Sequence, residues 1–234
     1  MLRRARVVSV GLCLLAAIAS AQAPALKRAP KVGDTATYKL TMVFTLFADE
    51  ATYTAKLTEK VADVQPAGTY TVERTQTEYK VLVAGEEGKI QTEKIPKQSV
   101  TYTSLGDVVE IKGDLVTDSA YRIANLSAIR LSGEAPAMGA TWTRDLKEDQ
   151  KSGVRAAKAL YKIDGEEKIG ETDCWVASFD YLEADSNAPA RSVGHVWLKK
   201  TDSTMMKLVS EWTNAPIPGA PQPLPAKVLF EREN

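Results

Sequence analysis

The chain has 234 residues, with 30 Lys+Arg, 30 Asp+Glu, one His and two Cys. Its formal net charge of zero excludes the basic excess that is typical of nucleic-acid-binding proteins. One His and two Cys exclude a multi-His metal site and a disulfide scaffold, so the composition predicts no metal and no cofactor. The hydrophobic fraction of 44% is that of a folded protein, and the length suits one domain or two small ones.

The first 21 residues have the organisation of a secretory signal peptide. Three arginines among the first six residues form a basic leader, and residues 7–19 form an apolar run with the length of a signal h-region. This run is shorter than the roughly 20 residues that a membrane span needs. Cleavage can follow Ala21 or Ala23, and Ala21 is favoured because Pro24 follows the second site. We therefore expect a periplasmic or secreted protein without a transmembrane segment after cleavage.

Removal of residues 1–21 changes the charge and the cysteine count. Three positive charges and Cys13 leave with the leader, so 27 Lys+Arg remain against 30 Asp+Glu. Cys174 is then the only cysteine, and a packed core must stabilise the mature chain without an internal disulfide. Residues 22–30 are expected to form a flexible N-terminal segment, and residues 31–234 a single β domain.

Two long strands are predicted at the start of this domain. Residues 35–47 alternate strictly between apolar and mostly threonine side chains, which is typical of a half-buried antiparallel strand. Residues 51–64 repeat this alternation, and the short link 48–50 predicts a hairpin. The inward side chains expected on the second strand are Tyr53, Ala55, Leu57 and Val61.

The alternation continues along the rest of the chain. A third strand at about 69–83 is expected to contain a bulge, because its apolar parity switches between Val72 and Tyr79. Five prolines between residues 216 and 225 indicate an extended surface connection. Further strands are predicted near 99–104, 107–112, 141–146, 154–163, 172–182, 192–200, 205–212 and 226–232.

One helix is predicted, at about 119–131, with Asp118 or Ser119 as its N-cap. Long strands with one wet and one dry face coil to enclose the dry face, and a central helix can fill part of that concavity. We therefore predict a mainly β fold, in which long antiparallel strands form a strongly curved open sheet or an incomplete barrel. The sheet would be made of two successive halves, at about 31–135 and 136–234, with one short helix.

A weak internal repeat accompanies the two halves. Each half opens a strand after a turn, and a long hairpin follows. Duplication of a half and repeated use of the same turn chemistry both explain this pattern. The matching residues, at an offset of 106, are Pro30, Gly33, Thr35 and Thr37, and Pro136, Gly139, Thr141 and Thr143.

The layout of the chain also resembles a known class of exported protein. A leader precedes a strand opening with Gly33, Asp34 and Tyr38, and a second opening contains Gly139 and Trp142. Hairpins with Cys174-Trp175 and Trp197 follow. This layout is similar to uncharacterised exported bacterial β-proteins, which resemble the half-barrel carriers and sensors of lipoproteins, the Lol-type and sigma-regulator folds. The resemblance implies an incomplete barrel with a helical lid that holds acyl chains, and it assigns no ligand-contacting residue.

The four tryptophans are weak candidates for ligand binding. They all lie in the second half of the chain, and aromatic side chains on strands usually fill a core. If some line an open concave face instead, they would form a platform for an apolar ligand or a partner. These candidates are Trp142, Trp175, Trp197 and Trp212.

Cys174 and His195 are the one pair that resembles a nucleophile and its base. In a hairpin centred near Asn187, His195 would face Phe179, and Cys174 would lie about five residues, or roughly 16 Å, further along. We therefore predict no catalytic dyad, with Cys174 a small buried side chain and His195 a residue of a sheet face or rim.

An acidic cluster near the same turn also lacks the pattern of a known site. Its spacing is not that of a calcium loop, so a solvated acidic turn is favoured over a cation site. The cluster comprises Asp180, Glu183, Asp185 and Asn187.

These observations favour an exported, non-catalytic binding protein of the bacterial envelope. It would shelter an apolar ligand or a lipoprotein acyl chain, and its partners would be lipid, lipoprotein or another envelope protein. The alternative is a structural or protein-interaction component of the envelope without a small-molecule ligand, with sheet edges and segment 216–225 as contact surfaces. No enzyme is expected, because no convergent set of polar residues is visible.

Overall fold

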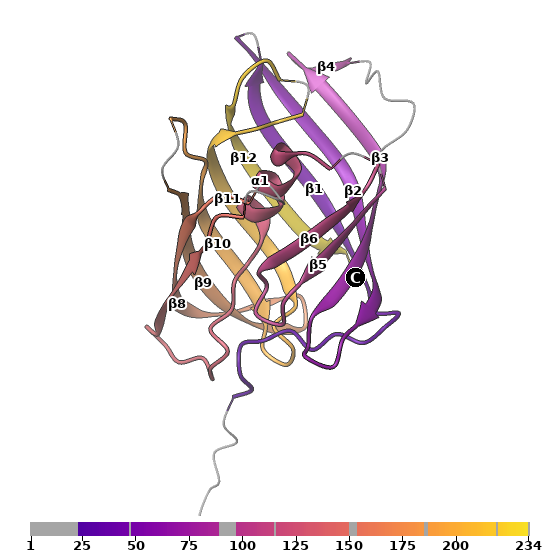
Figure 1. Ribbon diagram of the computed structural model, residues 1–234. Coiled ribbons are helices and arrows are strands. Elements are labelled where there is room, and N and C mark those ends of the chain that lie inside the picture. Colours follow the sequence, from indigo (N-terminus) through magenta and orange to yellow (C-terminus); the bar gives the residue numbers. More distant parts are fainter. Residues whose placement is uncertain are drawn as a thin grey trace, which may run out of the picture.

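The computed structural model describes residues 23–46, 48–88, 97–114, 116–149, 154–184, 187–218 and 220–233. The predicted signal peptide and its cleavage site lie outside the described residues. Within the described part, the chain forms one twelve-stranded antiparallel sheet and one helix (Figure 1). The mainly β fold predicted from the alternation is confirmed.

The strand order shows how the two halves meet. The sheet runs β6-β5-β3-β2-β1-β12-β11-β10-β9-β8-β7, with β4 beside β3. The chain therefore starts at the centre of the sheet, moves out to one edge, crosses to the other edge and returns to the centre, where β1 and β12 pair. The elements are β1 (Thr35–Leu46), β2 (Asp49–Val64), β3 (Tyr70–Val83), β4 (Glu86–Gly88), β5 (Gln98–Tyr102), β6 (Val108–Gly113), α1 (Asp118–Ser127), β7 (Thr141–Leu146), β8 (Ala157–Ile169), β9 (Thr172–Glu183), β10 (Arg191–Lys199), β11 (Met205–Ala215) and β12 (Leu224–Glu233).

The first hairpin has the register that its alternation predicts. Tyr38 pairs with Leu57 and Leu40 pairs with Ala55, and all four side chains are buried on the concave face. Successive residues of a strand point to opposite faces, so the intervening threonines and lysines lie on the outer face. The alternation therefore sets both the strand type and the buried face.

The bulge expected in the third strand is present. On β3, Glu78 and Tyr79 together stand opposite Ala55 of β2, and Glu78 has a positive φ of 52°. One extra residue on one strand reverses the parity of everything beyond it. This explains why the apolar residues switch faces between Val72 and Tyr79.

Some strands extend beyond their predicted ends. The prediction for β8 stopped at residue 163, whereas the strand continues to Ile169 through the register shift at Gly165. Residues 164–168 are polar and mostly exposed, so they carry no apolar alternation, and pairing with β9 alone keeps them extended. β4, which pairs with the end of β3, was not predicted as a strand because it also contains no apolar residue.

The helix is shorter than predicted, and its N-cap is different. The side chain of Thr117, rather than Asp118 or Ser119, accepts a hydrogen bond from the Ala120 amide at 3.2 Å. The helix ends at Ser127, because the following residues are extended and bind other parts of the fold. In this strap, which we define as residues 128–131, the Leu131 amide donates to the Leu105 carbonyl at 2.8 Å. Tertiary partners thus override the helical spacing of the apolar residues.

The sheet is strongly curled and remains open. In the described residues, the edge strands β6 and β7 each pair with one neighbour only, and α1 lies on the concave side (Figure 1). Leu126 and Leu131 belong to the main core, while Tyr121, Ala124 and Ala128 pack in a second core with β2, β3, β5 and β6. The curved open sheet is the form that the long amphipathic strands predict. No helix in the described part of the chain has the length and apolarity of a membrane-crossing segment.

Candidate functional site

A cavity of about 510 Å³ occupies one end of the concave face. It lies where β1 begins and β12 ends, near the C-terminus that is marked in Figure 1. The inward faces of β1, β2 and β3 form one wall, and the strap and the turn between β10 and β11 form others. Its apolar lining includes Val61, Val72, Leu131, Leu198 and Met205.

The segment before β1 completes the cavity wall. Leu26 is buried in the main core, its amide donates to the Glu134 carbonyl at 2.7 Å, and its carbonyl accepts from the Gly133 amide at 2.9 Å. The Arg28 amide donates to the Ser104 carbonyl at 2.8 Å. These backbone hydrogen bonds hold Arg28 at the cavity, beside the loops that follow α1 and β5.

A charged and aromatic cluster lies at the centre of the cavity wall. The Arg74 guanidinium contacts the Glu59 carboxylate at 2.7 Å and donates to the Tyr102 hydroxyl at 2.5 Å. Tyr102 is stacked on Tyr70 with ring centroids 5.7 Å apart. Desolvation raises the pKa of Tyr102 above its usual value, although Arg74 acts in the opposite direction. Arg74 is therefore a paired cation that orders the tyrosines around it.

Tyr38 forms the part of the wall nearest the centre of the sheet. Its hydroxyl donates to the Met205 carbonyl at 3.2 Å, and its ring meets Phe230 edge-on at 6.5 Å. Desolvation raises the pKa of Tyr38 well above its usual value, Glu59 raises it further, and the positive charges of Arg28 and Arg232 lower it. Both guanidinium groups therefore act electrostatically on this one buried phenol.

We expect stability to fall at alkaline pH because of the buried tyrosines. Their folded pKa values lie above the unfolded value of 10.0, and that of Tyr181 is raised to about 12, mainly by burial. The folded state retains these protons above pH 10 while the unfolded state loses them, so their contribution is complete below pH 10 and is lost as pH rises. The other members of this set are Tyr38, Tyr70 and Tyr102.

Urea denaturation across this pH range, combined with tyrosinate absorbance, measures the effect. The free energy of unfolding should decrease above pH 10, and the buried tyrosines should ionise together with unfolding. A stability that rises with pH in this window would contradict the assignment.

Inward-facing charges are the sequence signal for the cavity, and the motif-based site predictions contain none of them. Glu59 lies between Leu57 and Val61 at the same parity, so alternation alone places it on the concave face. Arg74 lies two residues after Val72, and Arg232 two residues after Phe230, so both also occupy inward positions of their strands. These three charged residues interrupt the apolar inward faces of β2, β3 and β12 at one end of the sheet. A search for catalytic and metal motifs does not detect such breaks.

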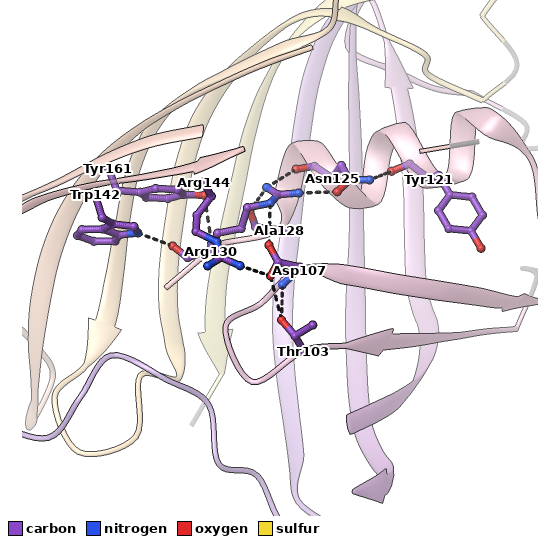
Figure 2. Close-up of polar contacts among 9 residues, drawn as sticks. All are labelled: Thr103, Asp107, Tyr121, Asn125, Ala128, Arg130, Trp142, Arg144 and Tyr161. Atoms are coloured by element: carbon purple, nitrogen blue, oxygen red, sulfur yellow. Dashed lines mark hydrogen bonds and ion pairs between the residues drawn. The ribbon is translucent and has the colours of Figure 1, made fainter. Parts of the chain in front are cut away.

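A polar network spans the gap between the two sheet edges (Figure 2). Asp107, in the loop between β5 and β6, contacts Arg144 of β7 at 2.5 Å and Arg130 of the strap at 3.8 Å. The Thr103 hydroxyl donates to the Asp107 carboxylate at 3.1 Å and accepts from the Asp107 amide at 3.1 Å. The ion pairs therefore join opposite halves of the open sheet next to the cavity.

Trp142 holds the strap in place instead of facing the cavity. Its indole N–H donates to the Arg130 carbonyl at 2.9 Å, and the Tyr161 hydroxyl accepts from the Arg130 amide at 3.1 Å. The rings of Trp142 and Tyr161 are stacked at 5.0 Å with an interplanar angle of 6° (Figure 2). The Arg130 side chain is fully buried and donates to the carbonyls of Ala128 and Asn125 at 3.1 and 3.3 Å.

None of the four tryptophans lines the cavity. Trp175 and Trp212 are buried in the main core, as expected for aromatic residues on strands. Trp197 lies on the outer face, where its indole N–H donates to Glu167 at 2.8 Å and Lys207 lies 5.2 Å from the ring centroid. The structure thus gives the tryptophans packing and surface contacts and does not gather them on one platform.

Cys174 and His195 are not close enough to act together. His195 pairs with Ser178, one residue from the predicted Phe179, and Cys174 lies four residues further along β9, roughly 13 Å away. His195 is exposed on the outer face, whereas Cys174 is fully buried.

Burial should protect the Cys174 thiol from modification. Desolvation is the main cause that raises its pKa above the usual value, so little thiolate is present at neutral pH. We expect a thiol-specific chromogenic disulfide to react slowly with the folded protein and rapidly in denaturant. Equal rates in both conditions would show that the thiol is accessible.

The acidic residues near the turn between β9 and β10 point in different directions. Glu183 is buried and bonded to Arg122, while Asp180 pairs with Arg191 on the outer face. Asp185 lies outside the described residues. Across the part of the chain that the structure describes, no group of three or more His, Cys, Asp or Glu side chains has the arrangement of a metal site.

Comparisons with known proteins leave the family open. No protein-family model matches the chain, and no curated protein matches it. A solved structure from Bacteroides fragilis, described as a protein predicted to be exported with a YmcC-like fold, aligns with 90% of this chain and 100% of its own. The two sequences are 10% identical and the TM-score is 0.35. The resemblance to Lol-type carriers therefore remains a prediction from the sequence.

Proposed function

We propose that this chain is an exported, non-catalytic binding protein of the bacterial envelope that shelters a ligand with an apolar part, such as an acyl chain. The observation that supports this most is the cavity of about 510 Å³ at the end of the concave face, because pockets of this size hold small molecules. Side chains normally pack a protein interior to high density, whereas the side chains at this end of the concave face leave a cavity. The signal-like leader supports a location outside the cytoplasm.

The apolar lining comes from several elements at once. Val61 and Val72 contribute from β2 and β3, Leu131 from the strap, and Leu198 and Met205 from the ends of β10 and β11. A hydrocarbon chain placed there would be removed from water on several sides, and about 0.8 kcal/mol is gained for each CH₂ group that is buried.

Native mass spectrometry of the protein exported by its own leader tests this proposal. We expect bound molecules that organic extraction recovers and that carry alkyl chains. A protein that is repeatedly free of ligand, and that takes up no alkyl probe, would contradict the proposal. Purification from the envelope without detergent avoids replacement of the natural ligand.

A second candidate function, protein interaction, is supported by the outer face. Four large apolar side chains are exposed there, on β8 to β11, with 40–47% of their surface accessible. Such residues favour a partner protein when they gather on one face. They are Leu160, Leu182, Val193 and Val209. Co-purification of a partner that is lost in Leu160→Ser and Val193→Ser variants would support this alternative.

A further inference from the structure

The charges that line the cavity are not balanced. Among the described residues of the lining, basic side chains outnumber acidic ones, five to three. The basic ones are Arg28, Lys31, Arg74, Lys199 and Arg232, and the acidic ones are Asp34, Glu59 and Asp202. The cavity therefore has a cationic excess next to its apolar lining.

Contacts within the wall already use the three carboxylates. Glu59 pairs with Arg74 at 2.7 Å, and Asp202 pairs with Lys199 at 3.2 Å. Asp34 accepts a hydrogen bond from the Lys31 amide at 2.7 Å, which closes the turn before β1. None of these three acids forms an ion pair with Arg28 or Arg232.

Arg28 and Arg232 are the two guanidinium groups of the cavity lining that have no partner among the described residues. Neither side chain makes a hydrogen bond or an ion pair with a described residue, and both are half-buried. Arg232 stands directly opposite Tyr38 on the neighbouring strand, and backbone hydrogen bonding to Ser104 holds Arg28 at the same cavity. Both charges lower the pKa of Tyr38, which lines the same cavity.

Two partly desolvated guanidinium groups in one wall favour a bound anion. Arginine binds carboxylate and phosphate through paired N–H donors, and such hydrogen bonds are stronger where water is excluded. We infer that the ligand of this cavity is an anionic amphiphile, whose carboxylate or phosphate head lies between Arg28 and Arg232 and whose hydrocarbon part lies along Val61, Val72 and Leu131. This inference rests on the proposed function and adds the charge and polarity of the ligand.

Calorimetric titration with four probes tests the inference. Laurate and dodecyl phosphate carry an anionic head and a chain, dodecanol carries the chain alone, and inorganic phosphate carries the anion alone. Each is titrated below its aggregation concentration into the full mature chain. We expect the two anionic amphiphiles to bind about 10-fold or more tightly than dodecanol, because charged hydrogen bonds add to the same chain burial.

Substitution of the two arginines separates head recognition from chain burial. Arg28→Gln and Arg232→Gln should each weaken laurate binding, and the double variant by about 10-fold or more, while dodecanol binding stays unchanged. Arg155→Gln is the control, because Arg155 does not line the cavity and should leave all four affinities unchanged. Thermal unfolding of each variant establishes that it is folded.

The outcomes distinguish the inference from the proposed function. Equal affinity for laurate and dodecanol, or full laurate binding by the folded double variant, would overturn the inference and leave an apolar cavity in place. Phosphate binding as tight as that of dodecyl phosphate would assign the site to a free anion and overturn it too. Binding of none of the four probes would contradict both.

Discussion

Replacing Glu183 with alanine should destabilise the protein by about 3–5 kcal/mol. Its carboxylate accepts from Arg122 Nε at 2.8 Å and from a terminal nitrogen of the same guanidinium at 2.7 Å, and it also accepts from the Ala190 amide at 2.8 Å. The Glu183 side chain is 0% exposed and that of Arg122 10% exposed. Removal of the acid would leave a buried cation with only the Ala188 carbonyl as a partner, and a buried amide with none. Urea denaturation followed by circular dichroism measures the loss.

The neighbouring strands provide a matched control for this pair. Arg191 of β10 and Asp180 of β9 also form two guanidinium–carboxylate hydrogen bonds, at 2.9 and 2.6 Å, but their side chains are 48% and 34% exposed. Water already solvates this second pair, so Asp180→Ala should cost about 1 kcal/mol or less. Similar losses in the two variants would show that burial does not decide the strength of these bridges.

The second large effect is expected for Gly106→Ala. Gly106 has a φ of +87°, and a Cβ there would lie 2.1 Å from the Ile129 carbonyl oxygen. The strap that carries Ile129 is held by Arg130 and by the hydrogen bond from Leu131 to Leu105, so it cannot move away without breaking those contacts. Left-handed strain and the steric overlap together should cost about 2–5 kcal/mol.

Gly85→Ala separates these two contributions. Gly85 has a similar φ of +83°, but a Cβ there would meet no described atom within 4 Å. Its substitution should cost only the left-handed strain, about 1–2 kcal/mol. The difference in urea midpoint between the two variants then reports the contact between the β5–β6 loop and the strap. If the two variants have the same stability, that contact is not tight in solution.

Alternation predicted the fold well because it depends on local sequence alone. The buried faces of β1 and β2 were predicted from apolar residues at every second position. The bulge at Glu78 was predicted from a switch in the parity of the apolar residues along β3. The helix prediction was wrong beyond Ser127, because the strap binds Tyr161 and Leu105, which lie far away in sequence. No local pattern contains that information.

The cavity was missed for a different reason. Arg28, Arg74 and Arg232 are separated by long stretches of sequence, and the order of the strands brings them to one wall. Strand alternation shows that a charged residue points inward, but only the pairing of the strands shows that several such residues share one cavity wall. The size of the tryptophans suggests ligand binding, but their strand positions give them packing and surface contacts instead.

The pairing of β1 with β12 has a consequence for the order of folding during synthesis. Within each half, neighbouring strands are consecutive in the chain, apart from β3 and β5, which pair around β4. The strands of either half can therefore pair as soon as that half has been synthesised. The join between the halves needs residues that are almost two hundred positions apart and must wait for Leu224–Glu233. Until then β1 and β11 are unprotected edges with apolar faces, which invite pairing between molecules. A nascent chain with this topology therefore exposes two sheet edges until its last strand closes the centre of the sheet.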